Sequence, residues 1–246
     1  VTGPVKYYNY TNIVPTTITA GQGITATITA YGNNDVTVSS HTPFTITMTP
    51  VAGVTFYTDN TLVTATTTYT LANGIATIYA KATIAGSIVL TATDGLGRSK
   101  NTIATTITVN PSAVATVTVS GSTPITSGIQ SASYTAVSKD IYNNAVADTF
   151  TWTKANGTGT ATLSVDKLTG VVSGTVTITA TSVTNNLVAG NNVVTVVAGA
   201  IATVAVSGAT SITSGVQSAS YTAASTDAAG NAVADTFTWT NANGTG

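Results

Sequence analysis

The stretch Ala147-Asp-Thr-Phe-Thr-Trp-Thr-Lys-Ala-Asn-Gly-Thr-Gly159 recurs 87 positions later as Ala234-Asp-Thr-Phe-Thr-Trp-Thr-Asn-Ala-Asn-Gly-Thr-Gly246. The two copies contain both tryptophans of the chain, Trp152 and Trp239. Extended backwards, the alignment matches residues 115–159 to residues 202–246 at 35 of 45 positions. A repeat of this length, rich in strand-forming residues and carrying one Trp per copy, predicts a small β domain that serves as a tandem building block.

The composition favours β-structure along the whole chain. The 246 residues include 56 Thr and 20 Ser, and hydrophobic residues make up 43 %. β-Branched side chains fit a pleated strand and lose rotamer freedom in a helix, so we expect an all-β fold with packed cores. The chain has no Cys, which excludes an inter-sheet disulfide.

Charged residues are scarce and make up only 6 % of the chain, with no Glu and a net charge of −1. We therefore expect no nucleic-acid partner, because such partners need a basic surface. The exposed surface must instead carry neutral hydroxyls and amides, which pack readily against an identical subunit, so we expect self-association. We find no run of 18 apolar residues and expect no membrane span in this chain.

The repeat divides the chain into four segments. Residues 1–14 are aromatic and extended-looking, and form either a first edge strand or a strand donated to a neighbouring subunit. Residues 15–111 and 112–199 each predict a sandwich of short alternating strands. Residues 200–246 lack a counterpart of the last forty residues of the second sandwich, so they predict the first half of a third. Either the natural chain continues past Gly246 or a partner completes this half; we favour a longer parent protein.

Each repeat carries a Phe and a Trp two residues apart. Positions i and i+2 of a strand share a face, so the two rings of each pair are expected to point to the same side. We predict that Phe150 and Trp152 lie at the centre of the second core, and that Phe237 and Trp239 take the same places in the third.

Several motifs resemble bacterial Ig-like domains. Residues 161–182 are similar to the second half of such a domain, with its Gly-Thr-Val-Thr-Ile-Thr-Ala cadence. Asp227-Ala-Ala-Gly-Asn231 resembles the Asp-x-x-Gly-Asn turn of these domains, and Asp140-Ile-Tyr-Asn-Asn144 does so more loosely because it lacks the Gly. The first unit is similar to the invasin-like variety, in Thr19-Ala-Gly-Gln22 and Asn73-Gly-Ile-Ala-Thr-Ile78.

This resemblance covers most of residues 16–246 and implies tandem immunoglobulin-like β-sandwiches, the last one incomplete in this chain. Modules of this kind serve as stalks, spacers, S-layer subunits and filaments on bacterial and archaeal surfaces. The resemblance therefore implies an extracellular or cell-surface location. It specifies the fold and leaves the function open.

The inventory of catalytic side chains is poor. The single histidine, His41, lies in a polar loop with no Glu to orient it, so we expect no enzyme activity and no cofactor. Asp and Asn oxygens in turns are ligands that Ca²⁺ prefers, which makes a weak calcium site one interpretation of the turn residues. The alternative is that these side chains bond their own backbone. The residues concerned are Asp140, Asn144, Asp148, Asp227, Asn231 and Asp235.

Three Asn-x-Thr sequons begin at Asn9, Asn156 and Asn243. They predict glycosylation if the protein is exported by an archaeon or a eukaryote.

Two classes of function fit these patterns. The first is a non-enzymatic structural protein whose modules form an extracellular filament, S-layer or stalk, assembled through neutral Thr-rich surfaces and strand edges. The second is an adhesin that binds a surface carbohydrate or a host receptor. In the second case exposed aromatic rings would stack on sugars; the candidates are Tyr7, Tyr8, Tyr10, Tyr31, Phe56, Tyr57 and Tyr142.

Overall fold

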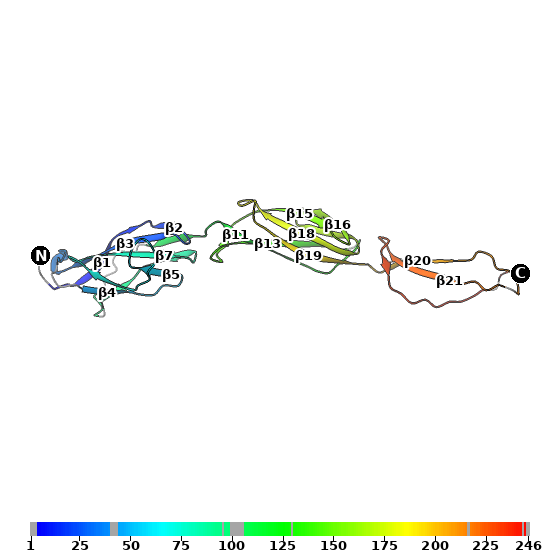
Figure 1. Ribbon diagram of the computed structural model, residues 1–246, viewed down its shortest axis with the longest axis horizontal. Helices are drawn as coiled ribbons and strands as arrows, with labels where there is room; N and C mark the ends of the chain where they lie inside the picture. Colours follow the sequence, from blue (N-terminus) through cyan, green and yellow to red (C-terminus); the bar gives the residue numbers. More distant parts are fainter. Residues whose placement is uncertain are drawn as a thin grey trace. The chain divides into compact units, whose positions relative to one another are not determined.

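The computed structural model describes residues 4–39, 44–94, 96–98, 106–128, 130–215, 217–242 and 244. The described residues form strands joined by turns and one short 3₁₀ helix, Asn33–Asp35, so the prediction of an all-β chain is confirmed (Figure 1). Contacts divide the chain into two compact units. One unit comprises Val1–Ala115 and Lys139–Val146, and the other comprises Thr116–Ser138 and Ala147–Gly246.

The first unit is a sandwich of short sheets around one buried core. Its largest sheet has the strand order β1-β3-β7-β5, and two three-stranded sheets have the orders β2-β10-β8 and β6-β4-β9. One cluster of buried side chains draws on all three sheets, including Ile24, Ile46 and Ile107. The strands are β1 (Tyr7–Val14), β2 (Thr17–Thr19), β3 (Gly23–Tyr31), β4 (Phe44–Met48), β5 (Val54–Tyr57), β6 (Thr68–Leu71), β7 (Ile75–Ala82), β8 (Gly86–Ile88), β9 (Ala92–Thr93) and β10 (Ile107–Asn110).

Local sequence signals place these strands. In β3 the alternate residues Ile24, Ala26, Ile28 and Ala30 are all buried, as the period of two predicts. The β6–β7 hairpin turns at Asn73-Gly74, and both residues have positive φ, as a type I′ turn requires.

Strand β1 pairs antiparallel with β3 of the same chain, from Tyr7 opposite Tyr31 to Val14 opposite Thr25. Among the described strands β1 pairs with β3 alone, so it lies at the edge of this sheet, and its Tyr8 N–H donates to the Arg98 carbonyl at 3.0 Å. This is the first of the two arrangements expected for residues 1–14. Donation of the segment to a neighbouring subunit stays a prediction.

The second sandwich has two sheets. One has the order β11-β13-β17-β16, with β14 paired to β13, and the other has the order β12-β19-β18-β15. In each sandwich the second strand belongs to a different sheet from the first, and it pairs parallel with the last strand of the sandwich. Strand β2 pairs with β10, and strand β12 pairs with β19. The strands are β11 (Val114–Gly121), β12 (Ile125–Thr126), β13 (Ser131–Asp140), β14 (Ala145–Val146), β15 (Phe150–Asn156), β16 (Thr160–Ser164), β17 (Lys167–Val172), β18 (Gly174–Ser182) and β19 (Ala189–Val197).

The core of the second sandwich is centred on other residues than predicted. Phe150 and Trp152 are only partly buried, although Trp152 lies opposite the fully buried Ala180 of β18. The physical reason is the position of β15 at the edge of its sheet, where one flank of each side chain stays in contact with water. The fully buried side chains include Tyr134 and Leu168 instead.

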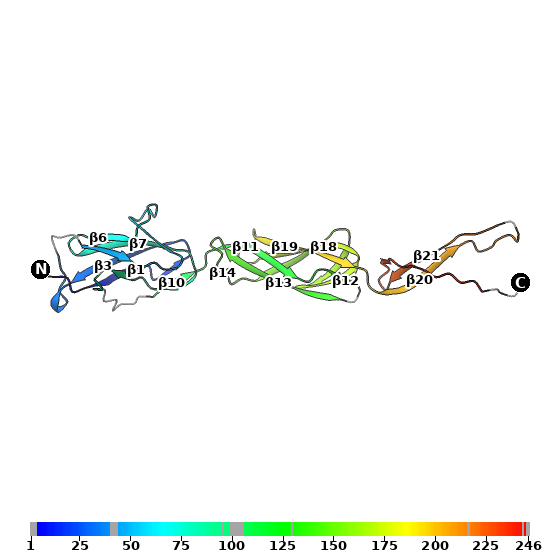
Figure 2. The same ribbon diagram turned by 90° about the horizontal axis from the view of Figure 1, so that it is seen from below.

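After the second sandwich the chain forms one three-stranded sheet from β20 (Ile201–Gly208), β21 (Tyr221–Asp227) and β22 (Ala232–Val233). In Figure 2 this sheet and the chain that follows it have no second sheet opposite them. Phe237 is partly buried and Trp239 is 53 % exposed, contrary to the prediction that both lie in a core. A single sheet offers no opposing layer to cover them. The third sandwich is therefore incomplete, as expected, and we call residues 200–246 the third module.

The predicted boundaries at residues 15–111, 112–199 and 200–246 follow the repeat, whereas the contacts assign Lys139–Val146 to the first unit. The boundaries stay a prediction. The contacts depart from the repeat at Lys139–Val146 because the side chains of Asp140 and Asn144 form hydrogen bonds with residues of the first unit.

Candidate functional site, a repeated Asp–Asn loop

The segments Asp140–Asn144 and Asp227–Asn231 share one local structure, and we call each of them an Asp–Asn loop. In both loops Oδ1 of the Asp accepts hydrogen bonds from the backbone N–H groups two and four residues later, at 2.8–2.9 Å. The fourth residue has positive φ, 70° at Asn143 and 83° at Gly230. Asn and Gly are the residues that adopt this conformation most readily, so the loop keeps its shape where the Gly is missing.

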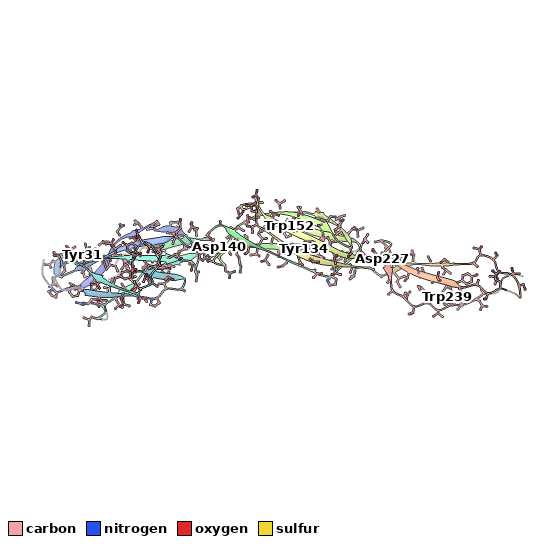
Figure 3. The ribbon with its side chains drawn as sticks, viewed as in Figure 1. Tyr31, Tyr134, Asp140, Trp152, Asp227 and Trp239 are labelled. Carbon is pink, nitrogen blue, oxygen red and sulfur yellow. The ribbon has the colours of Figure 1, made fainter. Side chains whose placement is uncertain are left out.

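The first Asp–Asn loop bonds with the first unit through the carboxamide of Asn144. Its Nδ2 donates to the Thr83 carbonyl and its Oδ1 accepts from the Ala85 N–H, both at 2.8 Å. The second carboxylate oxygen of Asp140, a residue that Figure 3 labels, accepts from the Ser112 N–H at 2.8 Å. Asn144 therefore offers the backbone of residues 83–85 one donor and one acceptor, as the backbone of a neighbouring strand does.

The second Asp–Asn loop repeats this pattern in the second unit. Asn231 Nδ2 donates to the Val171 carbonyl at 3.1 Å, and Oδ1 accepts from the Ser173 N–H at 2.9 Å. The second carboxylate oxygen of Asp227 accepts from the Gly199 N–H at 2.8 Å. Each Asn thus bonds a carbonyl and the N–H two residues later, in the module that precedes its own along the chain. Each Asp holds the segment that joins those two modules.

A buried hydroxyl strengthens the second loop. Ser127 Oγ donates to Asp227 Oδ2 at 2.6 Å and accepts from Asn231 Nδ2 at 3.0 Å, and all three residues are buried. Hydrogen bonds from Ser127, from Asn231 and from the Gly199 N–H stabilise the ionised carboxylate, so they hold the pKa of Asp227 far below its usual value.

The carboxylate of Asp140 experiences two opposing effects. Burial by itself raises the pKa of this group, because it disfavours the charged form. The hydrogen bonds from the Asn144 side chain and from the Ser112 N–H outweigh burial, and the net pKa is lowered. Both loops therefore carry an ionised Asp at neutral pH.

The geometry favours the turn interpretation of these residues over the calcium interpretation. N–H and O–H donors already point at both oxygens of Asp140 and of Asp227. Asp148 lies apart from the loops and accepts from Ser182 Oγ at 2.5 Å, while Asp235 accepts from the Thr236 N–H at 2.8 Å. Within the described ranges, no three His, Cys, Asp or Glu side chains gather as a metal site would require. Calcium binding stays a prediction.

Sequence reasoning selected the Asp and Asn of each loop but missed their partners. Six of the partners are backbone groups, and a backbone group leaves no signature in the sequence. They lie at Thr83, Ala85, Ser112, Val171, Ser173 and Gly199. Ser127 was missed as well. It lies 100 residues before Asp227 along the chain, and no local pattern links the two.

The predicted glycosylation sites differ in accessibility. Asn156 is exposed at the end of β15, whereas Asn9 is half-buried within the paired strand β1. Asn243 lies outside the described residues. Glycosylation stays a prediction at all three.

The aromatic side chains proposed to stack on sugars do not form an exposed platform. Five of them, namely Tyr7, Tyr8, Tyr10, Phe56 and Tyr57, are buried in the first unit. Tyr31 stacks on Tyr7 with ring centroids 5.2 Å apart, and Tyr142 is exposed. Alternation in the strands directs most of these rings into the core, so this part of the carbohydrate hypothesis is wrong.

The first unit has a surface hollow of about 380 Å³ beside β5. Its lining is apolar or carries hydroxyls, and it includes no titratable side chain: Pro50, Val54, Thr55, Phe56, Ala65, Thr66 and Thr67. This hollow therefore offers no acid or base for catalysis. His41 lies outside the described residues. Among the residues that are described, no helix has the length and apolar character to cross a bilayer.

No family model matches the chain, and the comparison with curated proteins found no match. Among solved structures, the Escherichia coli adhesin FdeC is similar with a TM-score of 0.51 and 21 % identity, over 94 % of this chain and 77 % of FdeC. InvD of Yersinia pseudotuberculosis has a TM-score of 0.48 and 18 % identity, over 92 % of this chain and 71 % of InvD. Invasin, a bacterial integrin-binding protein, has a TM-score of 0.46 and 19 % identity, over 90 % of this chain but 47 % of invasin.

At 21 % identity the likeness to FdeC concerns the fold. It agrees with the two-sheet arrangement of the second sandwich. The chain thus has the fold of tandem Ig-like β-sandwiches that bacterial surface adhesins such as FdeC display, and the resemblance inferred from its motifs is confirmed at the level of the fold.

Proposed function

We propose that this chain is a non-enzymatic structural protein of the cell surface, in which tandem Ig-like modules build an extracellular filament, S-layer or stalk. The observation that carries this proposal is the repetition of the Asp–Asn loop. Two loops 87 residues apart use the same two side chains to hold the same kind of backbone positions. A connection between modules that recurs along the chain is typical of a protein whose modules are repeated to extend it.

The exposed strand faces support the same function. Hydroxyl groups on neighbouring strands bond one another, as in Ser131 with Thr169 at 2.6 Å and Thr203 with Thr226 at 2.6 Å. Such pairs satisfy the polar groups of the surface without charge. A neutral face of this kind has little electrostatic repulsion to prevent contact with an identical face, so we place self-association on these faces.

Strand edges are the second surface through which we propose self-association, and they differ in how readily a further strand can pair with them. Lys154 lies on the edge strand β15 in register with the fully buried Ile178, so it belongs to the inward face of that strand. A charge at this place discourages the addition of a further strand. We therefore expect no strand addition at the β15 edge. At the β1 edge the Tyr8 N–H already donates to the Arg98 carbonyl at 3.0 Å, so pairing there would use the remaining backbone groups of β1.

Negative-stain microscopy of the purified protein tests this function. We expect fibres or ordered lattices at neutral pH, and we expect them to persist at high salt because few charges are involved. The double variant Thr203→Lys and Thr226→Lys places charge on one hydroxyl face and should reduce assembly, while Lys167→Thr, at an exposed site, should not. Single particles under all conditions would contradict the proposal.

A second candidate function is adhesion, and the fold shared with the adhesin FdeC favours it. In this case the modules present a binding surface to a receptor or a carbohydrate. Soluble particles that bind a glycan array or a host-cell surface in the same preparation would support adhesion over assembly. Five of the seven aromatic side chains proposed to stack on sugars are buried, so we expect a protein receptor rather than a sugar if binding is found.

A further inference from the structure

Each Asp–Asn loop contacts a short turn at the end of the second strand of a sandwich. Residues 19–22 and 126–130 form these turns, and we call them Gln-anchored turns because the last residue, a Gln, accepts a side-chain hydrogen bond from the N–H of the first, at 2.8 Å and 3.2 Å. The second residue of each turn, Ala20 or Ser127, donates its N–H to the end of the last strand of the sandwich, β10 or β19. Ala20 and Ser127 therefore occupy equivalent places.

The third residue of each Gln-anchored turn is a Gly with positive φ, +92° at Gly21 and +72° at Gly128. A Cβ added to Gly21 would lie 2.3 Å from the hydroxyl oxygen of Tyr142 and 2.8 Å from two of its ring carbons. A Cβ added to Gly128 would lie 3.7 Å from the Cβ of Ala229. Tyr142 and Ala229 are the third residues of their loops. The same place on the Gly is thus covered by an aromatic ring in the first loop and by a methyl group in the second.

The turn and the loop also differ in one hydrogen-bonding group. In the second loop Ser127 Oγ lies between the two loop side chains, because it donates to Asp227 Oδ2 at 2.6 Å and accepts from Asn231 Nδ2 at 3.0 Å. In the first loop the equivalent residue is Ala20, which has no hydroxyl group. Where loop and turn meet, the first loop therefore has a ring on a Gly, and the second has a hydroxyl bridge.

The other contacts of the two loops are alike. Each Asn bonds one backbone carbonyl and the N–H two residues later, and each Asp bonds the N–H of the connecting segment. Figure 3 labels Asp140 and Asp227, which begin the two loops. Because these bonds are shared, a difference in how firmly the two loops are held must come from the contact between loop and turn.

We propose that the Gln-anchored turn and the backbone groups beside it form a docking surface for an Asp–Asn loop, and that two positions decide which loop the surface holds. One position is the second residue of the turn, Ala20 or Ser127. The other is the third residue of the loop, Tyr142 or Ala229. A turn with Ala requires a loop with an aromatic third residue, whereas a turn with Ser holds a loop whose third residue is small.

The two contacts can replace each other because they restrain the loop in different ways. The hydroxyl of Ser127 bonds the carboxylate and the carboxamide at once, so neither side chain can rotate without breaking a buried hydrogen bond. The ring of Tyr142 covers the Gly of the turn, so apolar surface becomes exposed to water when the loop leaves. Either contact raises the cost of opening the loop, and each connection in this chain has one of them.

Hydrogen exchange of the full chain tests the proposal at the first loop, where the Ala85 N–H donates to Asn144. Tyr142→Ala removes the ring and should accelerate exchange at Ala85 at least about tenfold. The double variant Tyr142→Ala and Ala20→Ser supplies the hydroxyl instead, and it should return the rate to within about threefold of the original. Exchange at the Ser173 N–H, which reports on the second loop, should be the same in all these chains.

The reciprocal exchange of residues tests the second loop. Ser127→Ala should accelerate exchange at the Ser173 N–H at least about tenfold and leave Ala85 unchanged. Addition of Ala229→Tyr to this variant places a ring over Gly128 and should reverse most of the acceleration. A loss of protection that the second substitution restores identifies a contact between the two positions, because a merely destabilised unit would not recover.

The two glycines provide a matched control for backbone strain. Gly21→Ala and Gly128→Ala both place a Cβ at positive φ, so both variants carry this cost. Only Gly21→Ala also displaces the Tyr142 ring, so it should accelerate exchange at Ala85 more than Gly128→Ala accelerates exchange at Ser173. Addition of Tyr142→Ala to Gly21→Ala should cause no further acceleration, because the ring contact is already lost.

Three outcomes would overturn the proposal. The first is unchanged exchange at Ala85 in Tyr142→Ala. The second is a failure of Ala20→Ser to restore the protection lost in Tyr142→Ala. The third is an equal acceleration at Ala85 and Ser173 in any single variant, because the substitution would then act on overall stability and not on one loop. All rates are measured on the single chain, so the proposal can fail while the proposed assembly stands, and the reverse.

Discussion

Replacement of Asn144 offers the sharpest test of the Asp–Asn loop. In Asn144→Ala the Thr83 carbonyl and the Ala85 N–H each lose a hydrogen bond of 2.8 Å. Each lost bond costs about 1–1.5 kcal/mol at a half-buried site that water can reach, so the loop should open more easily by about 2–3 kcal/mol. At about 1.4 kcal/mol per factor of ten, hydrogen exchange at the Ala85 N–H should accelerate about 30- to 150-fold.

The isosteric variant Asn144→Asp should be worse than the alanine variant. It keeps an acceptor for Ala85 but places a carboxylate oxygen against the Thr83 carbonyl and against Asp140, to which Asn144 Nδ2 now donates at 2.8 Å. Two carboxylates at this distance repel, and one would have to take up a proton. The matched control is Lys6→Thr, at an exposed site of the first unit, and it should leave the exchange rate within about twofold. An exchange rate at Ala85 that Asn144→Ala leaves unchanged would refute the structural role of the loop.

Three further predictions concern acid, a turn and calcium. Because the pKa of Asp227 is lowered from 3.8, the stability that its ionised form confers is complete above about pH 4 and is lost as pH falls through the lowered pKa; Asp227→Asn should be less stable at pH 7 and lose part of this acid dependence in thermal melts. Gly74→Ala should destabilise the first unit by more than about 1 kcal/mol, because φ is +76° and the new Cβ would lie 1.9 Å from the Val38 carbonyl oxygen, whereas Asn73→Gly should be tolerated; urea unfolding of both variants measures this. Addition of millimolar Ca²⁺ should leave the melting temperature as it is in EDTA, because a bound calcium ion would raise the melting temperature. A calcium-dependent rise that Asp140→Asn abolishes would establish the weak calcium site instead.

Much of the fold follows from periodicity and turn chemistry. Apolar and hydroxyl residues alternate in Phe44–Met48, which forms strand β4, and Asn73-Gly74 has the residues that a two-residue hairpin turn favours. The composition was enough to predict an all-β chain, because β-branched residues favour strands in almost any context. In the hydroxyl-rich run of residues 62–71 only Thr68–Leu71 forms a named strand, since the pattern of hydroxyl residues does not show where pairing begins.

The candidate site was predictable only in part. The spacing of Asp and Asn identified both loops and offered a turn role as one of two interpretations, since such side chains bond their own backbone. The sequence also suggested that a loop without Gly was a departure, but Asn143 adopts the same left-handed conformation as Gly230. The backbone groups held by Asn144 and Asn231 lie about 60 residues away along the chain, and only the folded structure brings them into contact.

The pair Ile125 and Ile212 shows where local sequence stops and tertiary structure begins. The same residues around each produce the same Gln-anchored turn, because that turn needs only groups within five residues. Yet Ile125 is fully buried and Ile212 is 57 % exposed, because burial depends on strands far away in the chain. The sequence by itself determined the strands, the turns and the repeat. The tertiary structure decided which faces are covered, since a strand cannot specify alone whether a second sheet will lie against it.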